Sequence, residues 1–466
     1  MKMLKSGLLG CSILIGLATP AFAAKPFEGV HLKMLACGDT SVTRLVKILD
    51  EFKQETGAEV TIDLYPYPGL IDKIVVETSS PTPSYQLLWI DSPWVGQLGE
   101  AGSLLDLDSL AKRDAKEVGL HDIMPIQLQE NSWQGKLYAI PASGMVWEMQ
   151  YRKDLFDNPD EKAAFKAKYG YDLAPAKTYK QYYDIAQFFT RKKGEKLAGK
   201  VLDKDFYGTA QAYSRVQGAI THDYFGIMRG FGGHFWDPKT GLSAMNGPAQ
   251  IASAEYMKSL IPFNPPDWGG LMWDLRTGYM ERGEDAESLY WSVRAVRLEN
   301  PKEAKVVGNV GYALAPTFGG RPEPSYTGAL SFAISSKVSG KQEQAAWAFI
   351  KWGTSEKIMR QLADQGISQT RRSILSDPAL QKKFPYYKSV LAGDENGRRR
   401  VFHPFYADVE ETFGVEMNKY MIGDTKTAKE ALDIATNKIN AKLAMFPLAT
   451  RLRWVNDPPL EVLKEH

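Results

Sequence analysis

Short apolar runs alternate with stretches of helical periodicity in the first part of the chain. We predict strands over residues 30–35, 58–64 and 86–90 and helices over 42–52 and 94–101. Asp39, Thr40 or Ser41 can cap the first of these helices, and Gly57 can end it. Strands that alternate with helices predict an α/β fold with a mostly parallel sheet, whose ligands bind outside the carboxyl ends of the strands. Asp39 and Asp91 stand at two such ends.

The segment from Gly135 to Phe156 has a different pattern, because two extended apolar runs are separated by an interruption at residues 142–144. Pro141 fixes its own φ and removes a hydrogen-bond donor, and Gly144 permits unusual backbone conformations, so a bend costs little here. Two interpretations are open. The segment is either an ordinary strand with a bulge, or a strand that leaves one sheet, bends and enters another. The second interpretation makes it a crossing between two lobes.

The rest of the chain predicts further α/β structure and a helical C-terminal part. We expect helices over residues 178–189, 248–260 and 345–350 and strands over 312–315 and 329–334. Residues 225–241 are rich in glycine and aromatic side chains and predict a helix end followed by a turn. Because there is no repeat and no low-complexity linker, we expect several crossings between the lobes rather than one tether.

Residues 1–23 are typical of a secretory signal peptide, since Lys2 and Lys5 precede an apolar run and small residues precede Ala23. Its removal takes two of the 57 Lys and Arg residues and none of the 55 acidic ones, so the exported chain is formally neutral. A neutral chain gives no support to nucleic-acid binding. No other apolar run approaches the ~18 residues of a membrane span. We therefore expect a soluble periplasmic protein.

Cysteine content and length constrain the fold further. Cys37 is the only cysteine beyond the leader, so an intrachain disulfide is excluded and the core must hold the fold together. A chain of 466 residues with 24% charged and 44% hydrophobic residues is typical of a globular protein of two domains. The run Arg398–Arg400 follows an Asn-Gly turn, and we interpret it as a solvated loop.

Several short motifs resemble those of one family and occur in that family's order. They are FKQETGAEV at 52–60, GSLLDLD at 102–108, GKLYAIP at 135–141 with YRKDLF at 151–156, AAWAFIKW at 345–352 and DPAL at 377–380. On these motifs the chain is similar to bacterial extracellular solute-binding proteins of family 1, the carbohydrate-binding components of ABC importers. One segment departs from the family, which often has Gly-x-Pro-x-Arg where residues 366–372 are GISQTRR, and the role of Arg371 therefore stays open.

The resemblance implies a two-lobed α/β periplasmic binding protein fold, type II-like, with lobes joined by several crossing segments. The implied boundaries are residues 24–141 and 300–335 for the N-terminal lobe and 142–299 and 336–466 for the C-terminal lobe. A sugar or sugar-like solute would bind with high affinity in the cleft, and the lobes would close over it by a hinge motion. The membrane subunits of an ABC transporter would recognise the closed form. We expect no cofactor, no metal and a monomer.

Sugars present hydroxyl groups at their edges and C–H groups on their faces, so a binding site combines polar groups with aromatic platforms. The ligand-binding positions that the resemblance implies are Asp39, Thr40, Asp91, Ser92, Ser143, Gly144, Met145, Tyr213, Ser214, Trp236, Trp291, Gly328, Ala329 and Arg371. Asp39 has a rival role as a helix cap. Trp291 has a rival role in the core, and we expect it to stack on the solute. Trp236 stays open between the two roles, and we expect His234 to be structural.

Two alternatives stay open. The first is an exported hydrolase acting on saccharides, which needs two carboxylates on either side of the glycosidic bond, a spatial relation that a sequence does not show. The motifs Gly-x-Ser-x-Gly and His-Glu-x-x-His, which mark other classes of hydrolase, do not occur. The same fold could instead bind a polyol, a polyamine or a metal. Paired tyrosines at 182–183 and 386–387 imitate those of iron-binding relatives, but helical periodicity explains the first pair as part of the core. The abundance of aromatic residues favours a sugar.

Overall fold

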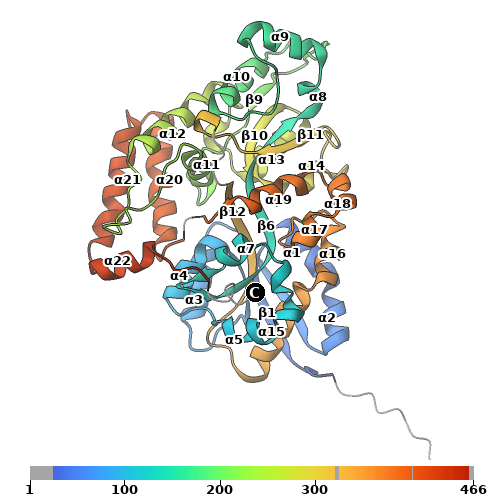
Figure 1. Cartoon of the computed structure of the whole chain (residues 1–466), viewed down its shortest axis with the longest axis vertical. Coiled ribbons are helices and arrows are strands. Elements are labelled where there is room, and N and C mark those ends of the chain that lie inside the picture. The colour runs from blue at the N-terminus through green and yellow to red at the C-terminus, as the bar shows by residue number, and fades with distance from the viewer. Residues whose placement is uncertain (1–24, 321–324, 401, 461–466) are drawn as a thin grey trace, which may run out of the picture.

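The computed structural model describes residues 25–320, 325–400 and 402–460, and the predicted leader lies outside these described residues. The chain forms two halves that lie one above the other in Figure 1, and one long strand, β6 (Ala139–Arg152), runs through both. The main sheet has the strand order β2-β1-β3-β12-β6-β10-β9, with β11 pairing on β6 and β13 on β12. β6 therefore joins two half-sheets.

The first half-sheet forms as the sequence predicts. Its strands are β1 (His31–Cys37), β2 (Glu59–Tyr65) and β3 (Leu87–Asp91), and its first helices are α1 (Thr40–Leu45), α2 (Leu49–Thr56), α3 (Leu70–Ser79) and α4 (Val95–Glu100). β1 pairs in parallel with both β2 and β3. The Asp39 carboxylate accepts hydrogen bonds from the backbone of Ser41 and Val42 and so caps α1, and Gly57 ends α2 with a φ of 83°.

The crossing strand β6 is continuous, and the expected interruption is a β-bulge within it. Its partners are β12 (Ser325–Ile334), β10 (Asp285–Trp291) and β11 (Val310–Leu314). The register against β12 shifts between Leu330 and Ser331 and leaves Ala142 without a partner. Residues 147–152 then pair with β10 and β11 of the other half. Both interpretations of this segment therefore hold in part, because a bulged strand also makes the crossing.

The sheet is mixed, which corrects the prediction of a mostly parallel sheet. β12 runs antiparallel to β3 and to β6, and β10 runs antiparallel to β6. The crossing strands thus pass between the halves in both directions, which antiparallel pairing allows. As a result, β10 runs opposite to β1 and β3, and its carboxyl end at Trp291 points back toward theirs. The carboxyl ends of both half-sheets face one space.

The second half is built around β10 and its neighbours. Its helices are α8 (Lys153–Phe156), α9 (Pro159–Tyr169), α10 (Tyr179–Phe189), α11 (Ala219–Gly230), α12 (Pro248–Ser259), α13 (Trp273–Arg282) and α14 (Ala295–Leu298), and the short strand β9 (Tyr207–Thr209) pairs with β10. Thr178 and Gln181 form a capping box at the start of α10. The sequence analysis missed β10, because Asp285 and Glu287 interrupt its apolar run although both are buried.

Helices from the last third of the chain are divided between the two halves. They are α15 (Gly340–Gly353), α16 (Glu356–Ala363), α17 (Arg372–Leu375), α18 (Pro378–Lys383), α19 (Tyr386–Glu395), α20 (Tyr406–Ile422), α21 (Ala428–Leu443) and α22 (Leu448–Val455). α15 packs on β1 and β12, and α16 packs on α1. α15 and α16 therefore lie with the first half. The sequence-based division, in contrast, assigns residues 336–466, which include both helices, to the C-terminal lobe. Conversely, β11 pairs with the part of β6 in the second half, although residues 300–335 were assigned to the N-terminal lobe.

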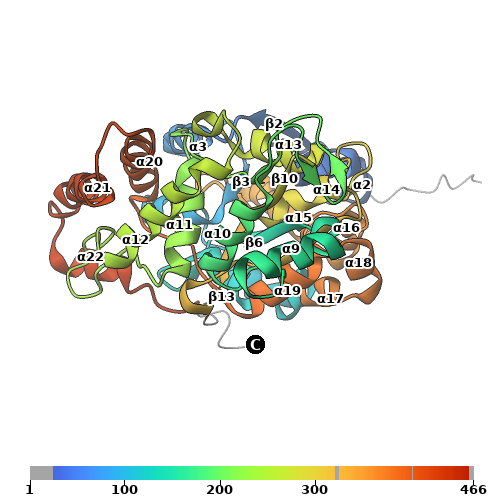
Figure 2. The same ribbon diagram turned by 90° about the horizontal axis from the view of Figure 1, so that it is seen from above.

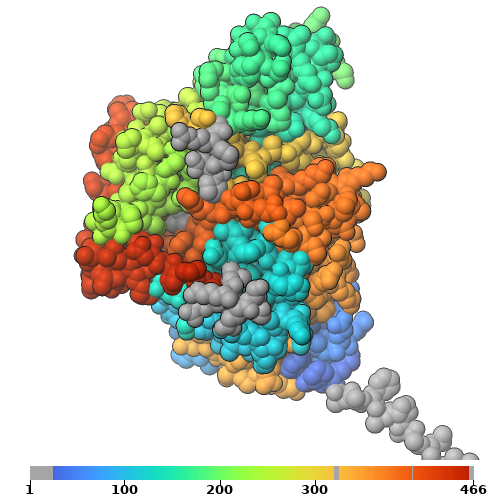
Figure 3. Space-filling view, in the orientation of Figure 1, coloured from blue at the N-terminus to red at the C-terminus, as the bar shows by residue number. Residues whose placement is uncertain are grey.

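The C-terminal helices lie at one side of the molecule, where α20 packs on α11 and α21 packs on α12 (Figure 2, and in red in the space-filling view of Figure 3). The remaining short elements are α5 (Asp108–Arg113), α6 (Ala115–Val118), α7 (Pro125–Glu130), β4 (Ser132–Trp133), β5 (Lys136–Leu137), β7 (Lys196–Leu197), β8 (Lys200–Val201) and β13 (Gly397–Arg398). Trp89, Trp347 and Trp352 belong to the core, as predicted. Within the described ranges, none of the helices has the length and apolar character that crossing a membrane requires.

Candidate functional site

A cavity of about 770 Å³ lies where the carboxyl ends of the two half-sheets meet. Of the residues predicted for the site, the cavity is lined by Asp39, Thr40, Asp91, Met145 and Trp291. They come from the ends of β1 and β3, from the crossing strand and from the end of β10. The arrangement follows from the strand directions, because the side chains that leave each sheet at its carboxyl end point into the same space.

Asp91 and Arg400 form a buried ion pair at the wall of this cavity. The guanidinium donates from Nη1 to both carboxylate oxygens, at 2.9 and 3.1 Å, and from Nη2 to Oδ2 at 3.1 Å. The hydroxyl of Tyr67 donates to the same Oδ2 at 2.7 Å. Burial by itself lowers the pKa of Arg400, but the Asp91 carboxylate opposes it and holds the pKa of Arg400 well above its ordinary value. The pair therefore carries both charges inside the protein.

The interpretation of residues 398–400 as a solvated loop holds for Arg398, which is exposed, but the position of Arg400 corrects it there. Its side chain is fully buried, and its backbone N–H donates to Oε1 of the buried Glu130 at 2.8 Å. Arg399 is partly buried, since it forms an ion pair with Asp457 and lies over the ring of Phe402. The local pattern of an Asn-Gly turn and three arginines could not show this, because the carboxylates that bind them are distant in the sequence.

Aromatic side chains surround the ion pair, but they cover one another. Trp291 is only 4% exposed, and the Arg400 guanidinium lies 4.9 Å from its ring centroid. The ring of Trp147 lies 5.4 Å from Trp291 and that of Tyr326 lies 5.3 Å from it. Tyr67, which hydrogen-bonds to Asp91, contacts Trp94 and Trp273, each with ring centroids 5.2 Å apart. These contacts occupy ring surface that a sugar ring would need for face-to-face stacking.

Asp39 caps α1 and also lines the cavity, so the two roles considered for it are compatible. Besides the cap, its Oδ2 accepts from Nε1 of Trp89 at 2.7 Å and from the thiol of Cys37 at 3.2 Å. Burial and the neighbouring Asp39 carboxylate raise the pKa of the Cys37 thiol well above its ordinary value. The Asp39 carboxylate therefore has fewer unused acceptor positions for a solute than its place at a strand end suggests.

Several predicted residues lie at the crossing rather than on the cavity. The Ser92 hydroxyl donates to Glu130 and accepts from the backbone N–H of Ala329, and the Ser41 hydroxyl donates to Ser143. Gly144 packs against the backbone carbonyl of Gln369, where a Cβ would approach to 2.6 Å. Gly328 packs against Arg400, where a Cβ would approach Cδ to 2.7 Å. These positions support the groups that line the cavity, and the two glycines are required by close approach.

Tyr213, Ser214 and Arg371 do not line the cavity, and Arg371 lies in the other half from the two loop residues. Tyr213 is buried in the second half and donates its hydroxyl to the carbonyl of Met257, and Ser214 follows it in the same loop. Arg371 is buried in the first half, where its guanidinium donates to the carbonyls of Val118, Gly119 and Thr354. These contacts make Arg371 a structural cross-link between loops.

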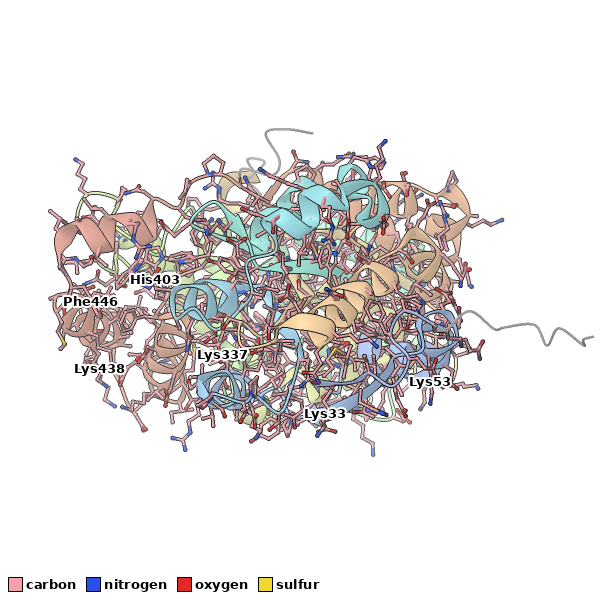
Figure 4. All side chains as sticks on the ribbon, turned by 90° about the horizontal axis from the view of Figure 1, so that it is seen from below. Lys33, Lys53, Lys337, His403, Lys438 and Phe446 are labelled. Carbon is pink, nitrogen blue, oxygen red and sulfur yellow. The ribbon has the colours of Figure 1, made fainter. Side chains whose placement is uncertain are left out.

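Trp236 and His234 line a separate cavity of about 380 Å³. Trp236 stacks on His403, with ring centroids 4.1 Å apart. Figure 4 shows His403 and Phe446 at the end of the molecule that the C-terminal helices form. Burial lowers the pKa of His403 to about 3, so its ring is neutral at ordinary pH. We therefore interpret Trp236 as part of the packing between α11 and the C-terminal helices.

His222, which the sequence analysis did not single out, connects the ion pair to a second carboxylate. Its Nε2 lies 3.1 Å from Oε1 of Glu410 and 3.4 Å from Nη2 of Arg400. The same Oε1 accepts from the hydroxyl of Tyr406 at 2.8 Å. Sequence reasoning could have found Tyr67, because it follows the carboxyl end of β2, but His222 and Glu410 lie on helices with no local signal.

The described residues contain no group of three or more His, Cys, Asp or Glu side chains arranged to hold a metal ion. The paired tyrosines that imitate an iron site are accounted for by packing. Tyr182 shares a hydrogen bond with Thr209, and Tyr386 and Tyr387 donate to backbone carbonyls. The cavity thus combines one carboxylate–guanidinium pair, hydroxyl groups and aromatic edges, which is suited to a solute with hydroxyl groups.

The pattern that describes bacterial extracellular solute-binding proteins matches residues 39–360. The chain belongs to this family. A solved structure of an ABC transporter solute-binding protein from Agrobacterium radiobacter in complex with ribitol is 30% identical with a TM-score of 0.80, covering 90% of this chain and all of that one. The two-lobed α/β fold predicted from the sequence motifs is thereby confirmed.

Two curated relatives extend the comparison within the family. A probable amino-acid ABC transporter periplasmic-binding protein from Sinorhizobium fredii is 23% identical over 83% of both chains. A mannitol-binding protein from Pseudomonas aeruginosa is 24% identical over 57% of both chains. The two relatives are named for different solutes, so the ligand of this member has to be argued from its own cavity.

Proposed function

We propose that this solute-binding protein binds an acyclic polyol in the cavity between its lobes and delivers it unchanged to the membrane subunits of an ABC importer. The observation that carries the proposal is the buried Asp91–Arg400 pair on the cavity wall. A leader that directs export would place the protein in the periplasm, where such a solute is first met.

The ion pair offers a hydrogen-bond donor and an acceptor side by side, and two adjacent hydroxyl groups of a solute can use both. A hydroxyl donates one hydrogen bond and accepts others, so a diol can accept from a guanidinium and donate to a carboxylate at the same time. Nε of Arg400 is buried and has no hydrogen-bond partner among the described residues, so the protein leaves one donor of the guanidinium unused. Two fixed charges that are already paired favour a neutral solute over an ionic one, because an ion would leave one of them uncompensated.

The covered aromatic rings favour an open chain over a sugar ring. A pyranose ring gains affinity by lying on a free aromatic face, but Trp291 is in contact with Arg400 and with neighbouring rings. An extended chain of carbon atoms needs only narrow contacts along ring edges, with its hydroxyl groups directed at the ion pair. The ribitol and mannitol ligands of the two similar proteins support this choice.

Contacts across the cavity support delivery by lobe closure. Tyr67 of the first half meets Trp273 of the second, and the backbone N–H of Gly69 donates to the side chain of Gln217 at 2.9 Å. A solute that touches both walls binds the closed form more tightly than the open one and therefore shifts the population toward closure. The membrane subunits would then distinguish loaded from empty protein by its shape.

The size of the cavity favours a second candidate, a cyclic sugar larger than one residue. A volume of about 770 Å³ lies in the range of sites for larger ligands and exceeds what a five- or six-carbon chain fills. Maltose is the ligand in a solved Thermotoga maritima structure of the same fold, at 21% identity. A larger sugar would have to use the cavity mouth rather than the aromatic rings at the ion pair.

A thermal-shift screen of the mature protein separates the candidates. Ribitol, mannitol, glucose, maltose and a neutral amino acid are added in turn, and the polyols are expected to raise the melting temperature. At one hundred times the dissociation constant, a bound solute stabilises the native state by about 2.7 kcal/mol. Chromatography of the released solute should return it unchanged. A shift with maltose alone would favour the second candidate, and cleavage of any solute would support a hydrolase instead.

A further inference from the structure

One aromatic side chain of the interlobe cavity, that of Tyr65, differs from the others in having an uncovered ring. The other rings that line the cavity are those of Tyr67, His222, Trp273, Tyr290 and Trp291. Each of these contacts a neighbouring ring or a guanidinium group. In the described part of the chain, the ring of Tyr65 has no such contact, and the residue is 39% exposed. Tyr65 therefore retains ring surface that a ligand can cover.

Tyr65 stands close along the chain to the Asp91–Arg400 pair. It is the last residue of β2 and pairs with Cys37 of β1. Two residues later, the hydroxyl of Tyr67 donates to Asp91 at 2.7 Å. Two residues of extended chain span at most about 7 Å, so the backbones of Tyr65 and Tyr67 are separated by no more than that. One solute can therefore reach the ion pair and the uncovered ring together.

Exposure increases from the ion pair toward Tyr65. The side chains of Arg400 and Asp91 are 0% and 3% exposed. Asp274, which lines the cavity from the second half, has a side chain that is 68% exposed. The ion pair thus marks the inner end of the cavity, and Tyr65 and Asp274 mark its mouth.

Polar groups from both halves accompany the uncovered ring. Arg294 of the second half lines the cavity and donates from Nη1 to Asp274 at 3.0 Å. Thr40 of the first half also lines it, and its hydroxyl has no hydrogen-bond partner among the described residues. A sugar ring needs an aromatic surface for its C–H face and polar groups for the hydroxyls at its edge. Tyr65 supplies the surface, and Thr40 and Arg294 supply the polar groups.

We propose that the solute is a polyol that carries one pyranose ring, with the polyol chain at the Asp91–Arg400 pair and the sugar ring on Tyr65. This inference rests on the proposed function, because it requires a polyol chain at the ion pair. The covered rings at the inner end favour an open chain there, whereas the cavity of about 770 Å³ has room for a larger ligand. A glycosylated polyol satisfies both observations.

Calorimetry with glycosylated and free polyols tests the assignment. Maltitol and lactitol carry a glucose or a galactose ring on the same glucitol chain, and glucitol is that chain alone. The wild type should bind at least one of the two glycosides about tenfold more tightly than glucitol, because stacking on an aromatic ring adds affinity of that order. The ratio of the two dissociation constants is the readout.

Substitutions at Tyr65 show whether its ring is the source of this preference. Tyr65→Ala should reduce the ratio to near one, since the ring surface is lost. Tyr65→Phe keeps the surface without the hydroxyl and should restore the ratio. Phe318→Ala removes an exposed ring that does not line the cavity, and this matched control should keep the wild-type ratio.

The outcomes distinguish this inference from the proposed function. Equal affinity for glucitol and both glycosides, or a preference that survives Tyr65→Ala, would overturn the placement of a sugar ring on Tyr65 and leave the proposed function standing. Maltose bound as tightly as maltitol would overturn both, because an open chain would then not be required. Folded protein that binds none of the polyols or their glycosides would also overturn both.

Discussion

Two buried aspartate–arginine pairs in this protein have the same chemistry and different surroundings. Asp91 and Arg400 lie on the wall of the interlobe cavity, where the guanidinium contacts both carboxylate oxygens and Tyr67 adds a hydrogen bond. Asp223 and Arg276 lie in the interior of the second half, where the guanidinium lies 3.6 Å from the centroid of the Tyr290 ring. Neither residue of this second pair lines the cavity.

The difference between the pairs separates binding from stability. Removing one charge of a sealed pair leaves the other in a medium that cannot solvate it. Removing one charge of a pair on a cavity wall leaves the other next to a space that can hold water, which can compensate part of the loss. The sealed pair is therefore expected to matter for folding, and the pair at the cavity is expected to matter for the solute.

The largest effect is expected for Asp223→Asn. The substitution leaves the Arg276 charge buried without compensation, so the free energy of unfolding should fall by about 3–5 kcal/mol. Urea denaturation followed by circular dichroism measures the change. At a temperature where the variant is folded, its polyol affinity should stay within about twofold of wild type, a free-energy change as small as that of a typical surface substitution. A variant as stable as wild type would show that the interior can admit water at this pair.

Asp91→Asn should have the opposite profile. Loss of the carboxylate removes the acceptor for the solute hydroxyl groups and loosens Arg400, so affinity should fall by about a hundredfold or more, which corresponds to about 3 kcal/mol. Calorimetry measures the affinity, and the unfolding free energy should change less than in Asp223→Asn. Asp172→Asn, on an exposed aspartate, is the matched control. Unchanged polyol affinity in Asp91→Asn would place the binding site elsewhere.

The smallest change in the free energy of unfolding, expressed per pH unit, is expected for Glu148. This buried acid of the second half has no cationic partner among the groups that shift its pKa. Burial raises the pKa of Glu148 to about 8, although Ser389 and Gln150 donate hydrogen bonds to it. Because the folded pKa exceeds the unfolded one, the group stabilises the fold fully below about pH 4, and the contribution is lost as pH rises toward 8. The loss is at most about 1.4 kcal/mol per pH unit.

Glu148→Gln tests this assignment, since the amide imitates the neutral acid. The variant should show a flatter decline in unfolding free energy between pH 5 and pH 8, measured by urea titration at each pH. Glu411→Gln, on an exposed glutamate, should retain the wild-type slope. An identical slope in wild type and Glu148→Gln would mean that the carboxyl group is ionised in the fold.

Local patterns in the sequence determined the elements of the first half and the family. Apolar runs and caps located β1, β2 and β3, the helical segment between β1 and β2 and the helix after β3, because each of these signals depends on residues close in the chain, whereas α3 was not predicted. Asp39 and Asp91 were identified as candidates because a strand end is a local feature. The motifs spread over the chain identified the family without any three-dimensional information.

Only the tertiary structure decided which side chains meet in the cavity. Arg400 was interpreted as solvated because Asp91, its partner, is 309 residues away in the sequence. The expectation that Trp291 stacks on a solute stays a prediction, and its sequence context could not show that Arg400 and two other rings contact it. Strand direction likewise depended on long-range pairing, since β6 and β12 cross between the halves in opposite directions. Local propensities fix the elements, but desolvation and charge pairing across long sequence separations fix the site.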